Sequence, residues 1–193
     1  MSYQTMDGRY RGIYAVENLG GQSPAGEAVY IRKQLDGTKL FYRKQADGIM
    51  LLGREKIAVR ETALTEENHT VFRHPLRVGT EWKETTFTRV LIKTGPPQKT
   101  EFHIVARVPV IMRVDSMTDT VDVPAGTFGD CMRITVSGDA FTNAGNYVGR
   151  TIVRVHEVNW YAPGVGLVKS VRRESTTSQA LDKGEITLEL EAY

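Results

Sequence analysis

Few residues in this chain have the types and spacing that chemistry requires. A metal site needs several converging ligands, and its commonest local sign is a pair of closely spaced histidines. The four histidines contain no HxH or HxxxH pair, and His69 and His74 are five residues apart at the end of an expected strand. We therefore predict no metal site.

The single thiol, Cys131, is the next candidate. A reactive cysteine needs a neighbouring cation, an imidazole or a helix N-terminus to lower its pKa. Only Arg133, two residues further along an expected strand, is placed to act in this way. A structural cysteine packed under the preceding turn fits the sequence better. One cysteine forms no internal disulfide, so Cys131 does not indicate a redox compartment.

Motifs for nucleophilic or phosphate chemistry are incomplete. Val136-Ser137-Gly138 lacks the first glycine of a G-x-S-x-G elbow. Gly164-Val165-Gly166 precedes an expected strand, whereas a phosphate-binding loop opens a helix. We predict no catalytic residue and no cofactor, with a hydrolase whose site is not visible in the sequence as the alternative.

Aromatic and cationic side chains on long expected strands are the remaining candidates. Aromatic rings can line a concave apolar cavity in a partly open barrel, and a cation among apolar residues can neutralise a ligand carboxylate or phosphate. The same residues also fit an ordinary β core or a solvent-facing strand, and the sequence leaves both interpretations open. The predicted ligand-binding residues are Trp82, Phe102, Arg107, Arg113, His156, Trp160 and Tyr161.

Composition excludes some partners. The chain of 193 residues has 25 basic and 23 acidic side chains, a net charge of +2. Nucleic-acid binding needs a concentrated basic field, so we predict no nucleic-acid partner. No stretch approaches the roughly 18 uninterrupted apolar residues of a membrane helix, so we also predict no transmembrane segment.

The elements that must position these residues are strands. Apolar residues recur at every second position from Phe102 to Val114, and Ile186, Leu188 and Leu190 alternate with polar residues. Pro109 lacks an N–H and is expected at a sheet edge or a bulge. At most, Glu61–Asn68 forms a short turn of helix. The other expected strands are Gly26–Gln34, Thr38–Gln45, Gly48–Arg54, Ile57–Ala63, Thr70–His74, Glu81–Lys93, Thr118–Val123, Asp130–Phe141, Tyr147–Trp160 and Gly166–Glu174.

These strands predict an all-β fold. Turn sequences such as Asp36-Gly37, Asp47-Gly48 and Lys183-Gly184 join them as hairpins. Ten to a dozen long antiparallel strands form a curved sheet, half-barrel or sandwich with little helix. We predict one domain over residues 1–193, with residues 1–8 as a disordered tail.

Three phrases join turn chemistry to strand chemistry: HPLRVGTEW at His74–Trp82, VDVPAGTFGDCMRI at Val121–Ile134 and NWYAPGVGLVKS at Asn159–Ser170. Together they resemble the DUF3108-like family, β-rich bacterial envelope proteins with the pattern PLxVGxxW, VPAGTFxxC and WYAPGVGLVK. The resemblance spans about Pro75 to Lys169. It implies a secreted antiparallel β fold similar to the half-barrels of lipoprotein carriers, and it brings no established catalytic residues.

The resemblance also bears on location. The first residues, MSYQTMDGRYRG, lack the apolar core of a signal peptide, which taken literally indicates a cytoplasmic protein. The resemblance instead implies a periplasmic or cell-envelope protein whose signal is absent from this sequence. We predict a non-enzymatic protein that binds a hydrophobic or lipid-like ligand, or a cell-envelope partner protein. A structural or assembly factor that pairs through strand edges is a further alternative.

Overall fold

The computed structural model describes residues 1–6, 11–22, 28–57, 62–89, 91–95, 100–103, 105–144, 149–178 and 183–193. All of the regular secondary structure within these ranges is β-strand, which confirms the all-β, single-domain prediction. The strands are β1 (Ser2–Met6), β2 (Arg11–Gln22), β3 (Val29–Gln34), β4 (Lys39–Gln45), β5 (Gly48–Ile57), β6 (Thr62–Arg73), β7 (Glu81–Phe87), β8 (Ile92–Gly95), β9 (Thr100–His103), β10 (Arg107–Val123), β11 (Gly126–Asn143), β12 (Arg150–Ala162), β13 (Gly166–Thr176) and β14 (Gly184–Ala192).

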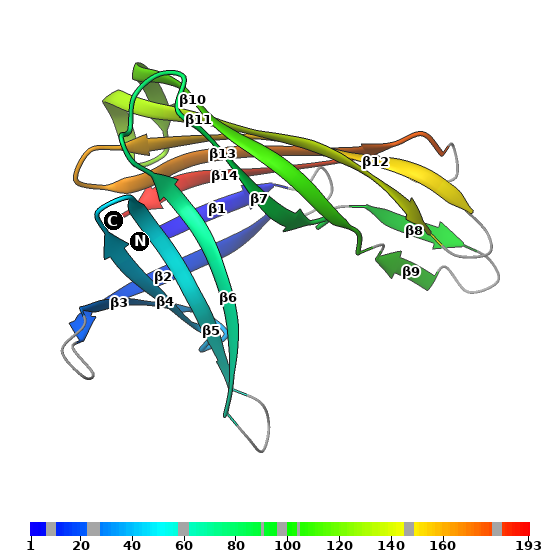
Figure 1. Ribbon diagram of the computed structural model, residues 1–193, viewed down its shortest axis with the longest axis horizontal. Coiled ribbons are helices and arrows are strands. Elements are labelled where there is room, and N and C mark those ends of the chain that lie inside the picture. Colours follow the sequence, from blue (N-terminus) through cyan, green and yellow to red (C-terminus); the bar gives the residue numbers. More distant parts are fainter. Residues whose placement is uncertain are drawn as a thin grey trace.

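Twelve of these strands form one antiparallel sheet. Its order is β6-β5-β4-β3-β2-β1-β14-β13-β12-β11-β10-β7, and β8 and β9 form a separate hairpin. The long strands β10 to β14 run together as one layer, and β2 to β6 turn away beneath it (Figure 1). The sheet is a nearly closed barrel, with β6 and β7 as its two edges.

Alternation explains the long strands. In β10, Val108, Val110 and Val114 are buried, whereas Pro109, Ile111 and Arg113, on the other face, are exposed. Two strands were expected here, with a break after Val114, but β10 continues through to Val123. Its pairing with β11 shifts register three times after Val114. These irregularities carry one strand past the point where the sequence alternation breaks.

Two local predictions are wrong. The expected helical turn at Glu61–Asn68 falls on β6, whose backbone is extended from Thr62 and pairs with β5. The expected disordered tail falls partly on β1, which lies between β2 and β14. Burial holds β1 in place, since Tyr3 is 1% exposed and its hydroxyl donates to the Leu167 carbonyl at 3.0 Å. Residues 7 and 8 lie outside the described ranges.

The core divides into two apolar clusters. One fills the concave side of the long strands, and the other lies toward β1 and the turns after β10 and β12. The first contains Trp82, Leu91, Ala106, Val108, Val110, Val114, Met132, Ile134, Val136, Val153 and Val155. The second contains Tyr3, Val16, Val121, Cys131, Ala162, Val168 and Leu190.

Candidate functional site

The two edge strands of the sheet are joined by side chains. On β7, the Trp82 indole N–H donates to the Thr70 carbonyl on β6 at 3.0 Å. The Glu84 carboxylate accepts from the Thr70 amide at 2.7 Å and lies 3.0 Å from Nδ1 of His69. Both polar backbone groups of Thr70 are therefore satisfied by β7 side chains where a closed barrel would use a neighbouring strand. We call these contacts the seam latch.

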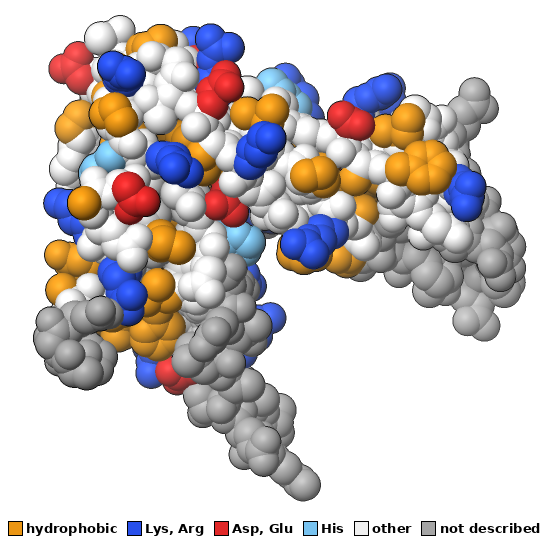
Figure 2. Space-filling model, in the orientation of Figure 1, with side chains coloured by type: hydrophobic (Ala, Val, Ile, Leu, Met, Phe, Trp, Pro, Cys, Tyr) orange, Lys and Arg blue, Asp and Glu red, His pale blue; other side chains and the backbone are white. Residues whose placement is uncertain are grey.

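Next to the latch lies a cavity of about 1040 Å³, the seam cavity. The sheet opens here because β6 and β7 diverge (Figure 1). The surface is hollowed between the layer of β10 to β14 and the strands β2 to β6 (Figure 2). Both edges contribute to the lining, which consists of Tyr14, Gln34, Leu40, Leu51, Arg54, Asn68, His69, Glu84, Thr85, Thr86, Phe87, Arg89 and Arg107. Most of these side chains are polar, so the lining differs from the apolar cavity that the aromatic residues suggested.

Positive charge exceeds negative charge around the seam cavity. Among the described residues, three arginines, Arg54, Arg89 and Arg107, line it together with one carboxylate, Glu84, a formal excess of two positive charges if His69 is counted as neutral. Glu84 is already engaged by the latch. The lining therefore suits an anionic group better than a neutral or cationic one.

A smaller pocket of about 90 Å³ adjoins the seam cavity, and Tyr14 and Leu40 line both. We call it the inner pocket; Tyr3, Arg32 and Tyr42 also contribute to it. Cross-strand register explains the grouping, because Arg32 lies opposite Leu40 and Tyr3 lies opposite Tyr14. Residues directly opposite in antiparallel strands point to the same face of the sheet.

Burial determines the protonation state of three tyrosines in the interior. It raises the pKa of Tyr3 and of Tyr42, against a smaller lowering by the nearby Arg32 charge. It also raises the pKa of Tyr161, with a further contribution from the negative charge of Glu157. These phenols therefore keep their protons at neutral and moderately alkaline pH, and remain hydrogen-bond donors.

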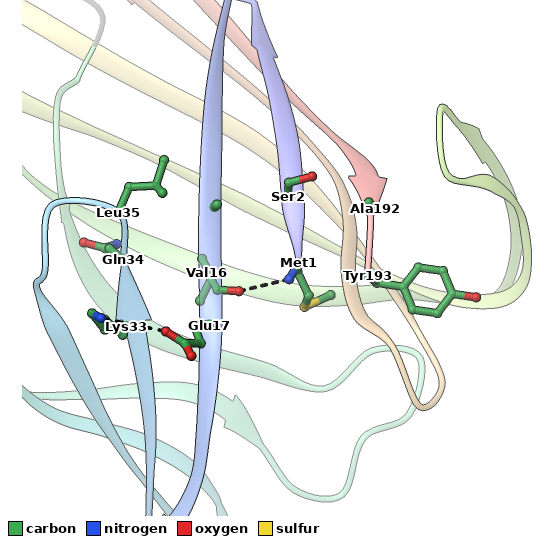
Figure 3. A pocket seen from close by; sticks show the side chains of 10 residues that line it. Met1, Ser2, Val16, Glu17, Lys33, Gln34, Leu35, Ala192 and Tyr193 are labelled. Carbon is green, nitrogen blue, oxygen red and sulfur yellow. Dashed lines mark hydrogen bonds and ion pairs between the residues drawn. The ribbon is translucent and has the colours of Figure 1, made fainter.

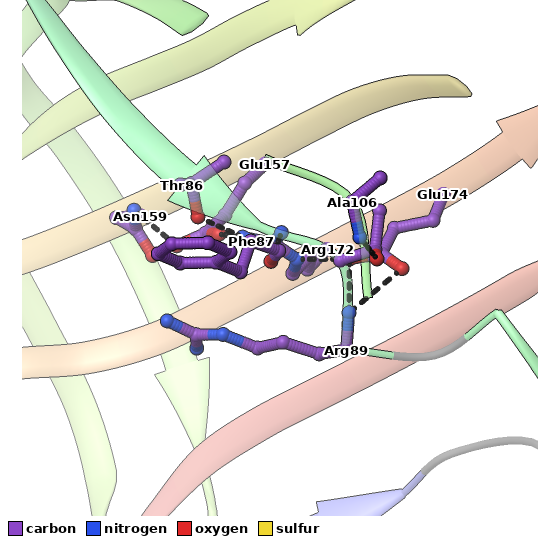
Figure 4. A network of polar contacts seen from close by, with 9 residues as sticks. Thr86, Phe87, Arg89, Ala106, Glu157, Asn159, Arg172 and Glu174 are labelled. Carbon is purple, nitrogen blue, oxygen red and sulfur yellow. Dashed lines mark hydrogen bonds and ion pairs between the residues drawn. The ribbon is translucent and has the colours of Figure 1, made fainter. Parts of the chain in front are cut away.

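A buried ionic network fastens the segment after β7 across the concave face. Arg172 is 1% exposed and donates to Glu174 at 2.7 Å, to Glu157 at 2.6 Å and to the Phe87 carbonyl at 2.7 Å. Glu174 in turn accepts from the Arg89 amide at 2.9 and 3.0 Å (Figure 4). The Arg89 side chain points away from Glu174 (Figure 4). The network thereby positions Phe87 and Arg89, which line the seam cavity.

Two further grooves lie outside the barrel interior. One, of about 490 Å³, lies beside the described chain ends and is lined by residues such as Leu35 and Tyr193 (Figure 3). Its charged side chains, Lys33 and Glu17, pair with each other at 3.8 Å. The other, of about 450 Å³, includes His156. Neither draws its lining from both edges of the sheet, so the seam cavity is the stronger candidate.

Three of the predicted ligand-binding residues lie in or near the interior. Arg107 lines the seam cavity. Trp82 is buried and forms part of the latch. Tyr161 packs edge-on against Phe72, with ring centroids 4.9 Å apart. The structure therefore brings Trp82 and Tyr161 to the inner face of the sheet, whereas Arg107 lies on the other face of β10 and lines the seam cavity from the start of that strand.

The other predicted residues lie elsewhere. Arg113, His156 and Trp160 are on the opposite, convex face: Arg113 lies 3.7 Å from Glu81, and the Trp160 indole donates to Asp119 at 3.0 Å. The side chain of Phe102 lies outside the described residues. Cys131 is buried, its thiol donates to the Phe128 carbonyl at 3.4 Å, and burial raises its pKa, which fits a packing role.

Four of the interior residues that were not predicted come from the first 60 positions. Tyr14, Arg32, Tyr42 and Arg54 line the two pockets, and none belongs to a phrase that matches a family. Alternation along the strand is the sequence signal that could have identified them, since Arg32 and Gln34 share one face of β3. Assigning that face to the interior requires the pairing of β3 with β2 and β4, which the local sequence does not contain.

The described residues contain no cluster of three or more potential metal-ligating side chains. Within the same residues, no helix is long and apolar enough to span a membrane. No curated protein and no solved structure matches the chain. A family model described as DUF3108-like matches residues 72–176, more than half of the sequence. This span holds the latch residues Trp82 and Glu84, the Arg172 network and the three phrases. The chain therefore belongs to the DUF3108-like family.

Proposed function

We propose that this protein binds an anionic amphiphile, a small molecule with a carboxylate or phosphate group beside an apolar part, and catalyses no reaction on it. One observation carries the proposal: a cavity of about 1040 Å³ lies between the two edges of a nearly closed sheet and carries an excess of positive charge. Ligand cavities typically measure roughly 300–1,000 Å³, so its size suits a molecule of this class.

The chemistry of the lining supports an amphiphile over a purely apolar ligand. Leu40, Leu51 and Phe87 offer apolar contact, and Arg107 and Arg89 offer cationic donors. A wholly apolar ligand would remove these guanidinium groups from water without replacing their hydrogen bonds, which is costly. A carboxylate or phosphate replaces them with charge-assisted bonds.

The histidine–carboxylate pair in the cavity supports a binding role. His69 and Glu84 resemble an acid–base pair, but both Glu84 oxygens are occupied, one by the Thr70 amide and the other by His69. Catalysis also needs a nucleophile or an activated water within reach of such a pair. The thiol of Cys131 is buried in the second apolar cluster, which does not line the seam cavity.

We further propose a periplasmic or cell-envelope location. The support is the resemblance of the three phrases between Pro75 and Lys169 to bacterial envelope proteins. Ligands of the proposed class are membrane components or their breakdown products, so a carrier near a membrane would meet them.

Binding is tested by native mass spectrometry of the purified chain, with organic extraction of bound material, and by isothermal titration calorimetry. The titrated probes are decanoate, decyl phosphate and uncharged decyl glucoside, each below its micelle concentration. We expect saturable binding of the two anions and weaker binding of the glucoside. A ligand-free mass together with no heat from any probe overturns the proposal.

The cavity is located by a matched pair of arginines on one strand. Arg107 lines the seam cavity at the start of β10, whereas Arg113, six residues further along the same face of that strand, does not line it and pairs with Glu81 and Asp115. Arg107→Gln should weaken decyl phosphate binding about 3- to 5-fold, as expected for a partly exposed charge contact. Arg113→Gln should leave it unchanged. Equal effects of the two substitutions would place the binding site elsewhere.

A further inference from the structure

We infer that the anionic group of the ligand occupies the inner pocket, where the Arg32 guanidinium and the hydroxyls of Tyr14 and Tyr42 bind it. This inference rests on the proposed function and assigns an orientation to the ligand: its charged group is innermost, and the remainder extends into the seam cavity. The shared chemistry is that of a carboxylate or a phosphate.

Arg32 is a half-buried cation whose hydrogen-bond partners are all neutral. Its Nε donates to the Asn18 side-chain oxygen at 3.2 Å, and an Nη donor meets the sulfur of Met1, a weak acceptor, at 3.5 Å. The tyrosine hydroxyls of the inner pocket are its other polar neighbours. Within the described part of the chain, Arg32 has no ion pair with a carboxylate. A guanidinium carries five donors in a planar fork that matches carboxylate and phosphate oxygens.

Two tyrosine hydroxyls supply further donors. The Tyr14 oxygen accepts from Nε2 of Gln34 at 2.6 Å, so the proton of Tyr14 is left to donate elsewhere. Burial keeps the Tyr42 phenol protonated. The Tyr3 hydroxyl is already used, because it donates to the Leu167 carbonyl. Arg32, Tyr14 and Tyr42 therefore present converging donors, which an anion needs and an alkyl chain does not.

The sizes of the two pockets set the orientation. A water molecule takes up about 30 Å³ of liquid, so the inner pocket of about 90 Å³ holds one carboxylate or phosphate and excludes a long chain. Tyr14 and Leu40 line both spaces, so a ligand anchored at Arg32 continues past them into the seam cavity. Arg107 stands at the outer part of that path, where a cation attracts anions before they bind.

The test compares deep and outer arginines in the full chain. By isothermal titration calorimetry, Arg32→Gln should weaken binding of decyl phosphate and decanoate about 10- to 100-fold, the range for a charged hydrogen-bonding partner. The same substitution should change the affinity for decyl glucoside less than 2-fold, because this probe has no charged group for Arg32 to bind. By stopped-flow fluorescence, Arg107→Gln should mainly lower the association rate for decyl phosphate, with a smaller salt dependence.

A second variant guards against loss of fold. Tyr42→Phe keeps the buried ring and removes only the hydroxyl, and should weaken decyl phosphate binding about 3- to 10-fold. Circular dichroism and urea unfolding confirm that each variant is folded. The ratio of decyl phosphate to decanoate affinity identifies which anion the pocket prefers.

The outcomes separate this inference from the proposed function. If the wild-type chain binds none of the probes, the proposed function fails. If wild type binds decyl phosphate and both Arg32→Gln and Tyr42→Phe bind it equally well, the ligand lies in the seam cavity but its anion is not in the inner pocket. That second result overturns the inference and leaves the proposed function standing.

Discussion

The indole N–H of Trp82 donates to the backbone carbonyl of Thr70 across 3.0 Å, and this bond joins the two edge strands of the sheet. Edge strands expose backbone groups that attract other chains. Here side chains of β7 cover the β6 edge. Trp82 donates to the Thr70 carbonyl, and the Glu84 carboxylate accepts from the Thr70 amide. The barrel is held together at one end of the seam and open at the cavity beside it.

Trp82→Phe should therefore loosen the β6 edge. The substitution removes the donor and leaves the Thr70 carbonyl unsatisfied, at a cost of about 1–3 kcal/mol, plus some lost packing. We expect a lower urea midpoint and faster amide hydrogen exchange over residues 68–73. Trp160→Phe is the matched control, because the Asp119 carboxylate that accepts from Trp160 also pairs with Arg133. Equal destabilisation by the two substitutions would show that the Trp82 bond has no special part in closing the sheet.

Arg172 and Arg173 are neighbours on β13 with opposite environments. Arg172→Met should destabilise the protein by about 3–5 kcal/mol, since it leaves Glu174, which is buried, without its cation. Arg173→Met should change stability by less than about 1 kcal/mol, because its partner Glu185 and Arg173 itself are both exposed. Urea unfolding of the two variants measures the difference. A small loss for Arg172→Met would mean that Glu174 finds another partner or a proton.

Alternation along a strand is a local property, and it predicted most of the sheet. Val108, Val110 and Val114 could be assigned to one face of β10 without any knowledge of its neighbours. Strand order was not predictable in this way. The pairing of β1 with β14 joins Tyr3 to Leu190, and no local pattern records a contact between residues so far apart. That pairing turns an expected tail into a central strand.

The candidate site depends on which face of each strand points inward. His156 and Tyr161 were both predicted as ligand-binding residues, yet they lie five positions apart on β12 and therefore point to opposite faces. Glu157 and Asn159 share the inner face with Tyr161. Residue type alone favours both side chains, but a strand presents only alternate residues to a cavity. Register from neighbouring strands supplies the missing choice.

Gly138 on β11 has no space for a side chain. A Cβ at this position would lie 2.0 Å from the carbonyl oxygen of Pro109 on β10. Because both groups belong to central strands, Gly138→Ala should cost about 3 kcal/mol or more, or prevent folding. Gly129→Ala on the same strand is the control, since no atom lies within 4 Å of its added Cβ. Thermal and urea unfolding compare the two. A stable Gly138→Ala protein would mean that β10 and β11 can separate at this point at little cost.

Asp119 on the convex face should make stability depend on acid. Hydrogen bonds from the Ser116 hydroxyl and the Trp160 indole, with the Arg133 charge, hold the pKa of Asp119 below its ordinary 3.8, against a raising effect of burial. A carboxyl whose pKa is lower in the folded state binds more protons when the chain unfolds, so its contribution is complete above about pH 5. It declines as the pH falls through the unfolded pKa and is lost below the folded pKa.

Asp119→Asn removes this titration. The difference in unfolding free energy between wild type and Asp119→Asn should be constant from pH 5 to 7 and should shrink as the pH falls below the ordinary pKa of 3.8. Urea unfolding at half-unit pH steps measures it. Ser116→Ala should reduce the acid dependence more than Arg133→Gln, because the Ser116 hydroxyl has the largest effect on the Asp119 carboxyl. A difference that stays constant down to pH 2.5 would show that folding does not change the proton affinity of Asp119.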